Sequence, residues 1–259
     1  MKKLIFIGGA LVILVIAVLV FVISNIGPLI KKAVNTYGPE ITKTDVRLED
    51  VSVSLFSGEA KLKEFHLGNP KGFKSPEALR VGSILLEVDK GSLTKDTIII
   101  EKIEILRPEI SYERDRSTDN FQTIIANVNK SIGAGGAPKG KTEGEKAGKK
   151  LRIRDCLIKD GKINLSSPLL GDKKIAAALP EIRLRNIGGD KGVSPEKAAQ
   201  VILSALYAKI TSPAVTNLLN EGLKSVGEDL KKQLELLGKD AGKGAGEIAD
   251  KMKGLLGTK

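Results

Sequence analysis

One uninterrupted apolar run near the start of the sequence constrains the chain more than any other feature. Residues 4–23 (LIFIGGALVILVIAVLVFVI) carry no charged side chain. A helix rises about 1.5 Å per residue, so about 20 residues span the roughly 30 Å hydrocarbon core of a bilayer. Lipid offers the backbone no hydrogen-bond partners, which favours a helix. A cleaved signal peptide is the alternative, but its apolar core is usually about 7–15 residues long and precedes a small-residue cleavage site. We therefore predict a retained transmembrane anchor.

Lysines on both sides of this run bear on its orientation. Lys2 and Lys3 precede it, whereas Lys31, Lys32 and Lys43 follow it, so the positive charge is nearly balanced. Long domains cross a membrane largely regardless of their own charge, so the short basic end decides the orientation. We expect the N-terminus in the cytoplasm and the bulk of the chain on the other side of the membrane.

After the first 45 residues the apolar periodicity changes from about 3.6 to 2, which is typical of strands with one apolar face. One template, apolar-x-apolar-x-x-apolar-x-apolar, recurs in full or in part in residues 45–56, 59–67, 97–106, 151–158 and 182–187. The additional residue in the middle would turn the second half to the opposite face unless a β-bulge restores the phase and bends the strand. We predict a curved, bulged, antiparallel sheet. Separate short strands and chance similarity among Ile/Val-rich strands are the alternatives.

Helical periodicity frames and interrupts this sheet. A short amphipathic helix is expected over residues 26–37, ended by Gly38 and Pro39, and another over residues 120–131 with Asp119 as its cap. From Ser194 onward the apolar residues recur at intervals of three or four, which predicts C-terminal amphipathic helices. The fold class is therefore α+β. The predicted organisation is a cytoplasmic tip and anchor (1–26), a juxtamembrane helix with the first part of the sheet (27–132), a flexible Gly/Lys/Glu linker (133–150), the second part of the sheet (151–190) and a helical region (194–259).

Composition and motifs argue against catalysis and against nucleic acid. The net charge is +11, but aromatic residues make up only 3% of the chain and tryptophan is absent, whereas binding to single-stranded nucleic acid usually uses stacking aromatics. An anionic lipid surface is the nearer partner, and a solvated basic surface is the alternative. His66 is the only histidine and Cys156 the only cysteine, and no nucleophile elbow, zinc motif or P-loop occurs. We expect no catalytic residue, no metal site, no cofactor and no enzymatic activity.

A further pattern of turns and strands covers about residues 35–190. It comprises the segments Asn35–Gly38, Val46–Leu55, Gly68–Phe73, Ala78–Gly82, Gly91–Leu93, Ile98–Pro108, Leu151–Leu165 and Leu179–Gly189. This pattern resembles the N-terminal region of AsmA-like proteins of Gram-negative envelopes. The resemblance implies a single-pass inner-membrane anchor, a periplasmic β-rich body and, as in the large members, an apolar groove similar to that of bridge-like lipid transfer proteins. The C-terminal helices lie outside the shared pattern, and one copy of so short a chain is not expected to bridge the periplasm.

The sequence thus predicts an envelope protein whose AsmA-like half-groove handles phospholipid or assists envelope assembly. Expected partners are the membrane, phospholipid acyl chains and other envelope proteins. The alternative is a structural or regulatory interaction protein of the inner membrane whose own helices close the sheet. The lipid-facing candidates are the apolar positions of the template: Val46, Leu48, Leu62, Phe65, Ile98, Ile100, Ile103, Ile105, Ile153 and Ile158.

Overall fold

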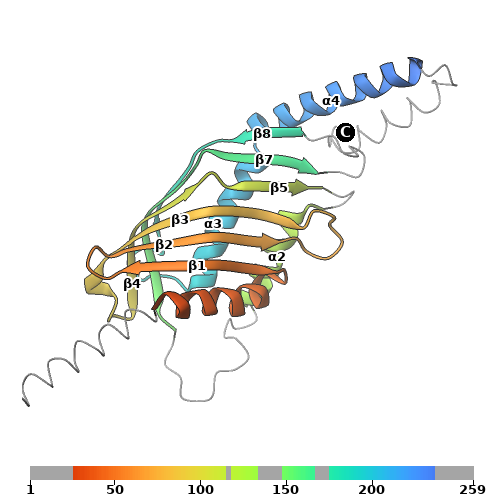
Figure 1. Ribbon diagram of the computed structural model, residues 1–259. Helices are drawn as coiled ribbons and strands as arrows, with labels where there is room; N and C mark the ends of the chain where they lie inside the picture. The colour runs from red at the N-terminus through yellow and green to blue at the C-terminus, as the bar shows by residue number, and fades with distance from the viewer. Residues whose placement is uncertain (1–25, 115–117, 134–147, 167–174, 237–259) are drawn as a thin grey trace, which may run out of the picture.

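A curved sheet with helices on one face forms the body of the protein (Figure 1). The computed structural model describes residues 26–114, 118–133, 148–166 and 175–236. The strands are β1 (Val46–Ser54), β2 (Glu59–Gly68), β3 (Glu77–Val88), β4 (Thr97–Leu106), β5 (Glu109–Glu113), β6 (Lys150–Lys159), β7 (Gly161–Ser166), β8 (Ile175–Leu179) and β9 (Ile182–Ile187). The helices are a first helix over residues 26–42, the short η1 (Lys90–Ser92), α2 (Asn120–Gly133), α3 (Pro195–Ile210) and α4 (Pro213–Leu236).

The predicted membrane anchor lies outside the described residues. So do most of the predicted linker, residues 134–147, and the part of the predicted helical region beyond residue 236. Among the helices that the structure describes, none combines the length and the apolar character needed to cross a bilayer.

The sheet is mixed, so the prediction of an antiparallel sheet is wrong in part. Strands β1 to β4 follow one another antiparallel, but β4 pairs with β6 in parallel, and β5 pairs with β7 in parallel. Between β5 and β6 the chain passes through α2 and 22 further residues. A crossover of that length returns the chain to the end of the sheet at which β4 began, which parallel pairing requires. The helical periodicity of α2 does not by itself indicate strand direction.

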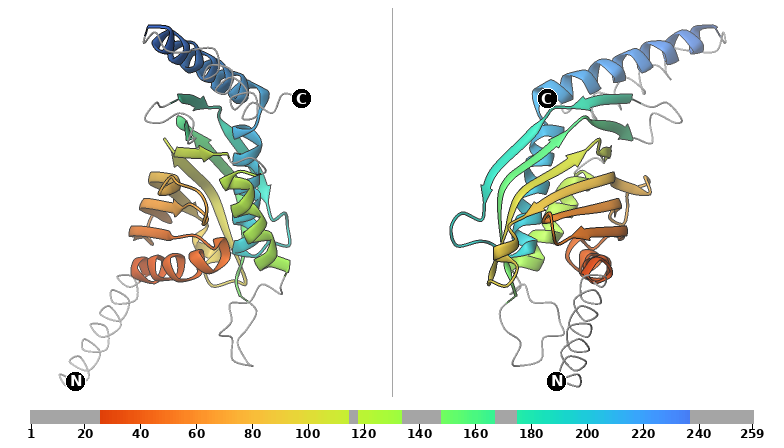
Figure 2. Two further views of the ribbon diagram at one scale, coloured as in Figure 1. Left: turned by 90° about the vertical axis from the view of Figure 1, so that its right-hand side faces the viewer. Right: turned by 60° about the vertical axis from the view of Figure 1, so that its left-hand side comes forward.

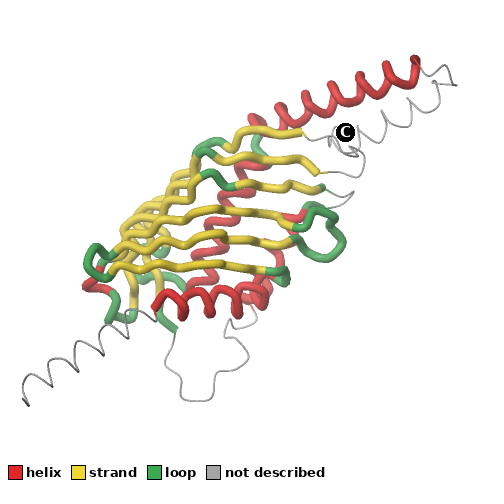
Figure 3. Tube along the Cα trace, viewed as in Figure 1, coloured by secondary structure: helices red, strands yellow, loops and turns green. Residues whose placement is uncertain are grey.

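A crease crosses the whole sheet, and in β1 and β2 it falls where the predicted template has its additional residue. By the strand registers, six residues from neighbouring strands lie in line along it: Glu49, Glu64, Gly82, Arg107, Asp160 and Pro180. Glu64, Arg107 and Asp160 adopt positive φ angles of 50°, 51° and 57°. At this line β4 gives way to β5, β6 to β7 and β8 to β9, and the strands bend together (Figure 3).

In β1 and β2 the crease corrects the prediction that each strand carries its own bulge. In a bulge, two residues of one strand oppose one residue of its neighbour. At the crease every neighbour contributes a residue to the same line, so pairing remains one-to-one across it. In β4 a bulge is present where the template predicts one, because the register with β3 shifts between Glu87 and Val88 and leaves Glu101 without a partner. The predicted curvature is confirmed, but it arises from an aligned fold of all the strands.

The core lies between the sheet and helices α2 and α3, which the strands curve around (Figure 2). On α2, the side chains of Phe121, Ile124 and Val128 are fully buried, as the helical spacing predicted. The predicted caps are also present, since the backbone N–H of Gln122 donates to Asp119 Oδ1 at 2.8 Å and Ser194 caps α3.

The first helix extends to residue 42, so the predicted end at Gly38 and Pro39 is wrong. A proline inside a helix removes one backbone donor and crowds the carbonyl group four residues earlier, but here the helix continues for three residues beyond Pro39. Gly38 instead allows a close approach, because a Cβ there would lie 2.7 Å from a methyl carbon of Val46. Lys43, with φ of 57°, ends the helix and turns the chain into β1.

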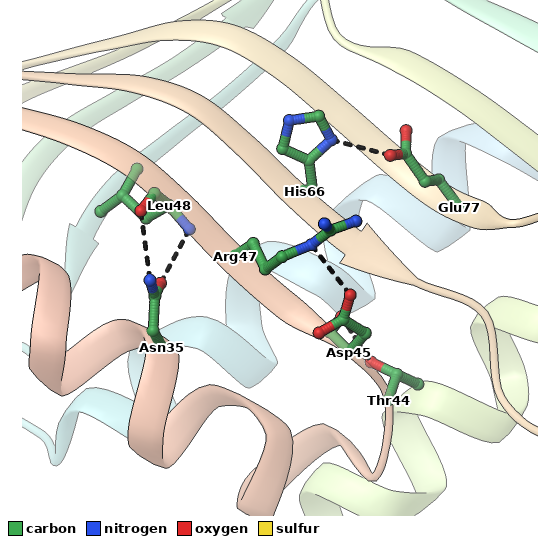
Figure 4. A network of polar contacts seen from close by, with 7 residues as sticks. All are labelled: Asn35, Thr44, Asp45, Arg47, Leu48, His66 and Glu77. Atoms are coloured by element: carbon green, nitrogen blue, oxygen red, sulfur yellow. Dashed lines mark hydrogen bonds and ion pairs between the residues drawn. The ribbon is translucent and has the colours of Figure 1, made fainter.

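This helix lies along β1, the edge strand of the sheet. Asn35 bonds to the main chain of Leu48 in both directions, donating from Nδ2 to the carbonyl oxygen at 3.2 Å and accepting the N–H at Oδ1 at 2.7 Å (Figure 4). An exposed row of such groups is a template for unwanted strand pairing. The Asn35 side chain therefore makes two of the backbone hydrogen bonds that a further strand would make with β1.

Candidate functional site: an apolar sheet face

The apolar positions of the template form continuous rows across the sheet. Residues directly paired in neighbouring strands point to the same face. One row beyond the crease consists of Val46, Leu67, Leu79, Ile110 and Ile163. On the other side of the crease, a second row consists of Val51, Leu62, Ile84, Ile105 and Ile158. The crease thus keeps the apolar side chains of both halves on one face.

The ten candidate residues predicted from the sequence differ in how far they are covered. Six are buried, namely Val46, Leu48, Ile100, Ile103, Ile153 and Ile158. Four are half-buried, namely Leu62, Phe65, Ile98 and Ile105. Seven of the ten belong to the main core or pack against it, whereas Leu48, Leu62 and Ile98 lie outside that cluster. Contact of any of them with lipid stays a prediction.

The least covered part of the apolar face lies in strands β1 to β4, on the side of the crease toward the β1–β2 turn. We call it the open patch, and it consists of Val53, Ala60, Leu62, Ile84, Leu86 and Ile105. All six are half-buried, whereas the row of Val46 and Leu67 beyond the crease is buried throughout. The sequence predicted the apolar character of Leu62 and Ile105 but could not predict which part of the face the helices leave uncovered.

The covered part of the face is held by a buried polar cluster centred on Asp119. Its Oδ2 accepts hydrogen bonds from the hydroxyls of Tyr112 on β5, at 3.3 Å, and Tyr207 on α3, at 2.8 Å. Burial, together with the neighbouring carboxylate, raises the pKa of Tyr207 to about 12 and also raises the pKa of Tyr112. Both tyrosines therefore stay protonated and keep α2, α3 and β5 together.

Glu113, at the end of β5, fixes a loop beside this cluster. Its carboxylate is buried and accepts the backbone N–H groups of Lys74 and Ser75, each at 2.8 Å. Glu113 was not predicted from the sequence, because a glutamate at a strand end carries no signal for a partner nearly 40 residues away. These contacts explain the buried charge as a structural one.

The opposite face of the sheet is charged. Asp155 on β6 accepts two hydrogen bonds from the guanidinium of Arg183 on β9, both at 2.9 Å, and these bonds hold its pKa below the usual range. His66 lies on the same face and shares a 2.8 Å hydrogen bond through Nδ1 with Glu77 (Figure 4). The only histidine is thus tied to a carboxylate of the neighbouring strand.

The chemically reactive side chains do not converge. Cys156 is fully buried within the core, and burial raises the pKa of its thiol to about 11. Across the residues that the structure describes, no group of three or more His, Cys, Asp and Glu side chains is placed to hold a metal ion. The distinctive surface of this body is therefore the apolar patch.

Comparison with known proteins finds one family. The family model described as "AsmA family" matches residues 1–185, which include strands β1 to β8, most of β9, and α2. No curated protein and no solved structure matches the chain.

Proposed function

The chain belongs to the AsmA family, and we propose that it is a membrane-anchored envelope protein that holds phospholipid acyl chains on the open patch. The family supports a role in the cell envelope. The proposed location is the inner membrane, with residues 4–23 as a single-pass anchor, the N-terminus in the cytoplasm and the body in the periplasm. The proposed role is non-enzymatic and involves no nucleic acid.

The observation that carries this proposal is the uneven cover of one apolar face. The rows of the sheet continue through Leu62, Ile84 and Leu86, but these side chains stay half-buried, whereas the row that contains Leu67 and Leu79 beyond the crease is buried. Acyl chains gain about 0.8 kcal/mol for each methylene group removed from water. A few such contacts along two rows would retain a lipid tail, and a basic chain of net charge +11 suits anionic headgroups.

The second candidate is a structural or regulatory interaction protein of the inner membrane. It is favoured by the helices that cover the edges of the sheet. The first helix lies along β1, and α4 packs on β8, where a Cβ at Gly222 would come 2.5 Å from a methyl carbon of Ile175. In this case another envelope protein, and not lipid, would cover the open patch.

Lipid analysis of two variants separates these candidates. We would purify the full chain from membranes in mild detergent and measure bound phospholipid by native mass spectrometry and lipid extraction. Leu86→Asn places an amide in the open patch and should reduce bound phospholipid. Leu85→Asn is the control, because Leu85 is also half-buried but pairs with Lys61 and Glu104 on the charged face. Equal lipid in both variants, or none in the wild-type chain, would favour the second candidate.

A further inference from the structure

Four loops come together at one end of the sheet, which we call the loop end. They are residues 55–58, 89–96, 148–149 and 188–193. The first two are joined where the N–H of Val88 donates to the carbonyl of Gly58 at 2.8 Å. Lys149 donates from Nζ to the carbonyl of Leu93 at 2.8 Å, and Leu151 exchanges two backbone hydrogen bonds with the last residue of the fourth loop. The loop end is therefore one continuous surface.

The described chain begins at this same end. Gly27 lies against the backbone of Val51, and Gly38 lies against Val46, so the first helix starts near the β1–β2 turn and runs away from it. Figure 1 shows this helix beside β1, with the start of the helix toward the loop end. The apolar run 4–23 thus joins the body next to the loops, only a few residues before Gly27.

Phe56 projects from the tip of the β1–β2 turn. Its side chain is 92% exposed, the largest exposure among the large apolar side chains that the structure describes. The turn itself is held, because Lys90 donates from Nζ to the carbonyl of Phe56 at 2.7 Å. Leu93 in the adjacent loop and Leu29 in the first helix are also exposed. Segments that lie at a membrane surface bury Trp, Phe and Leu side chains at the boundary between headgroups and acyl chains.

Exposed lysines lie on the strands and loops of the loop end and on the adjoining first helix, and Lys90 is bonded to the main chain of Phe56. They are Lys32, Lys90, Lys95, Lys149, Lys150 and Lys191. The exposed acidic residues of this end are fewer, and one of them, Asp190, pairs with Arg152 at 2.9 Å. Each lysine near an anionic bilayer contributes about 1 kcal/mol of attraction. An aromatic tip with lysines around it matches a lipid surface better than it matches a protein pocket.

We propose that the loop end is a bilayer-docking surface: the Phe56 ring enters the headgroup region of an anionic membrane, and the surrounding lysines contact phosphates. This inference rests on the membrane attachment in the proposed function and adds an orientation. The body would stand with its loop end on the membrane and with the far ends of β1 to β3 directed away from it.

Single-tryptophan fluorescence tests this orientation in the full chain, which contains no native tryptophan. The Phe56→Trp variant places the probe at the loop end. The Tyr37→Trp variant is the control, because Tyr37 is 45% exposed and lies beside Gly38, at the opposite end of the first helix. Each variant would be reconstituted into vesicles of phosphatidylcholine and phosphatidylglycerol, with and without brominated acyl chains.

We expect bromolipid to quench the Phe56→Trp variant and its emission to shift to shorter wavelength, with the Tyr37→Trp variant unaffected. Omitting phosphatidylglycerol should weaken the quenching if the lysines contribute. Vesicle flotation separates the two ways to fail. A chain that does not float with the vesicles refutes both attachment and docking. A chain that floats while the Phe56→Trp variant stays unquenched, or is quenched no more than the control, refutes docking alone.

Discussion

Removal of the Asn35 side chain tests how the edge of the sheet is protected. In Asn35→Ala, the N–H and carbonyl groups of Leu48 lose the partners that they have at 2.7 Å and 3.2 Å. The Leu48 side chain beside them is fully buried, which limits access of water to these groups. The substitution therefore leaves one donor and one acceptor of β1 poorly satisfied.

The expected loss follows from these two bonds. An intramolecular hydrogen bond contributes about 1 kcal/mol net, and a buried group left without a partner costs about 1–3 kcal/mol. Alanine recovers roughly 0.5 kcal/mol through its higher helix propensity. We therefore expect Asn35→Ala to lower the free energy of unfolding by about 2 kcal/mol and to speed hydrogen exchange at the Leu48 amide.

Urea denaturation of the full chain in detergent micelles, followed by circular dichroism, measures this loss. The midpoint should fall without a change in slope, because the surface exposed on unfolding hardly changes. Thr36→Ala is the control, since Thr36 is the exposed next residue of the same helix. A loss below about 0.5 kcal/mol, or one equal to that of Thr36→Ala, would refute the view that Asn35 protects the edge.

Three further predictions concern the loops, the charged face and the core. Gly188→Ala should lower the free energy of unfolding by more than about 1 kcal/mol, because φ is 90° and a Cβ would lie 2.7 Å from the carbonyl oxygen of Leu151. Gly189→Ala, with open space around its Cβ, should lower the free energy of unfolding less in the same denaturation assay. Because Arg183 lowers the folded-state pKa of Asp155, this pair stabilises the fold above the unfolded-state pKa, and the stabilisation is lost as the pH falls through the folded-state pKa. Asp155→Asn should therefore make the free energy of unfolding depend less on pH in the acid range, and an unchanged dependence would contradict this. The buried thiol of Cys156, with its pKa raised to about 11, should react with an aromatic disulfide reagent at pH 8 only at the rate of opening, and immediate reaction in the native chain would contradict its burial.

Local features were predictable from the sequence because they depend on neighbouring residues. Asp119 and Ser194 cap the helices that follow them, and the apolar spacing of α2 gives its buried face. Local rules fail where tertiary packing competes with them. The first helix continues through Gly38 and Pro39 because Gly38 is packed against β1.

Strand direction and the crease were not predictable, because both depend on how distant segments align. The template marks Glu64, but Arg107 and Asp160 lie outside its copies, so it could not show that all three share one line. Strand β8 was also missed. Its five residues include three alanines, which have a low preference for strands. The strand forms because it pairs with β7, which the local sequence does not indicate.

The candidate site was predictable as a face but not as a patch. Alternation indicates which side chains share a face, so Leu62 and Ile105 were found from the sequence. Cover depends on where α2 and α3 lie, which periodicity does not determine. Phe56 was missed for a related reason, since a single aromatic residue in a turn has no periodic partner and only its 92% exposure distinguishes it.

The two proposals concern adjoining parts of the molecule, which gives them a joint geometric consequence. Val53 and Ala60 of the open patch flank the turn that carries Phe56, and Leu86 lies close to the 89–96 loop. With the loop end on a bilayer, an acyl chain would reach the patch without crossing the charged face. It would then meet the crease, beyond which Leu67 and Val81 are buried. A lipid would therefore be held at the membrane-proximal half of the sheet, and onward passage would require movement of the helices that cover the other half.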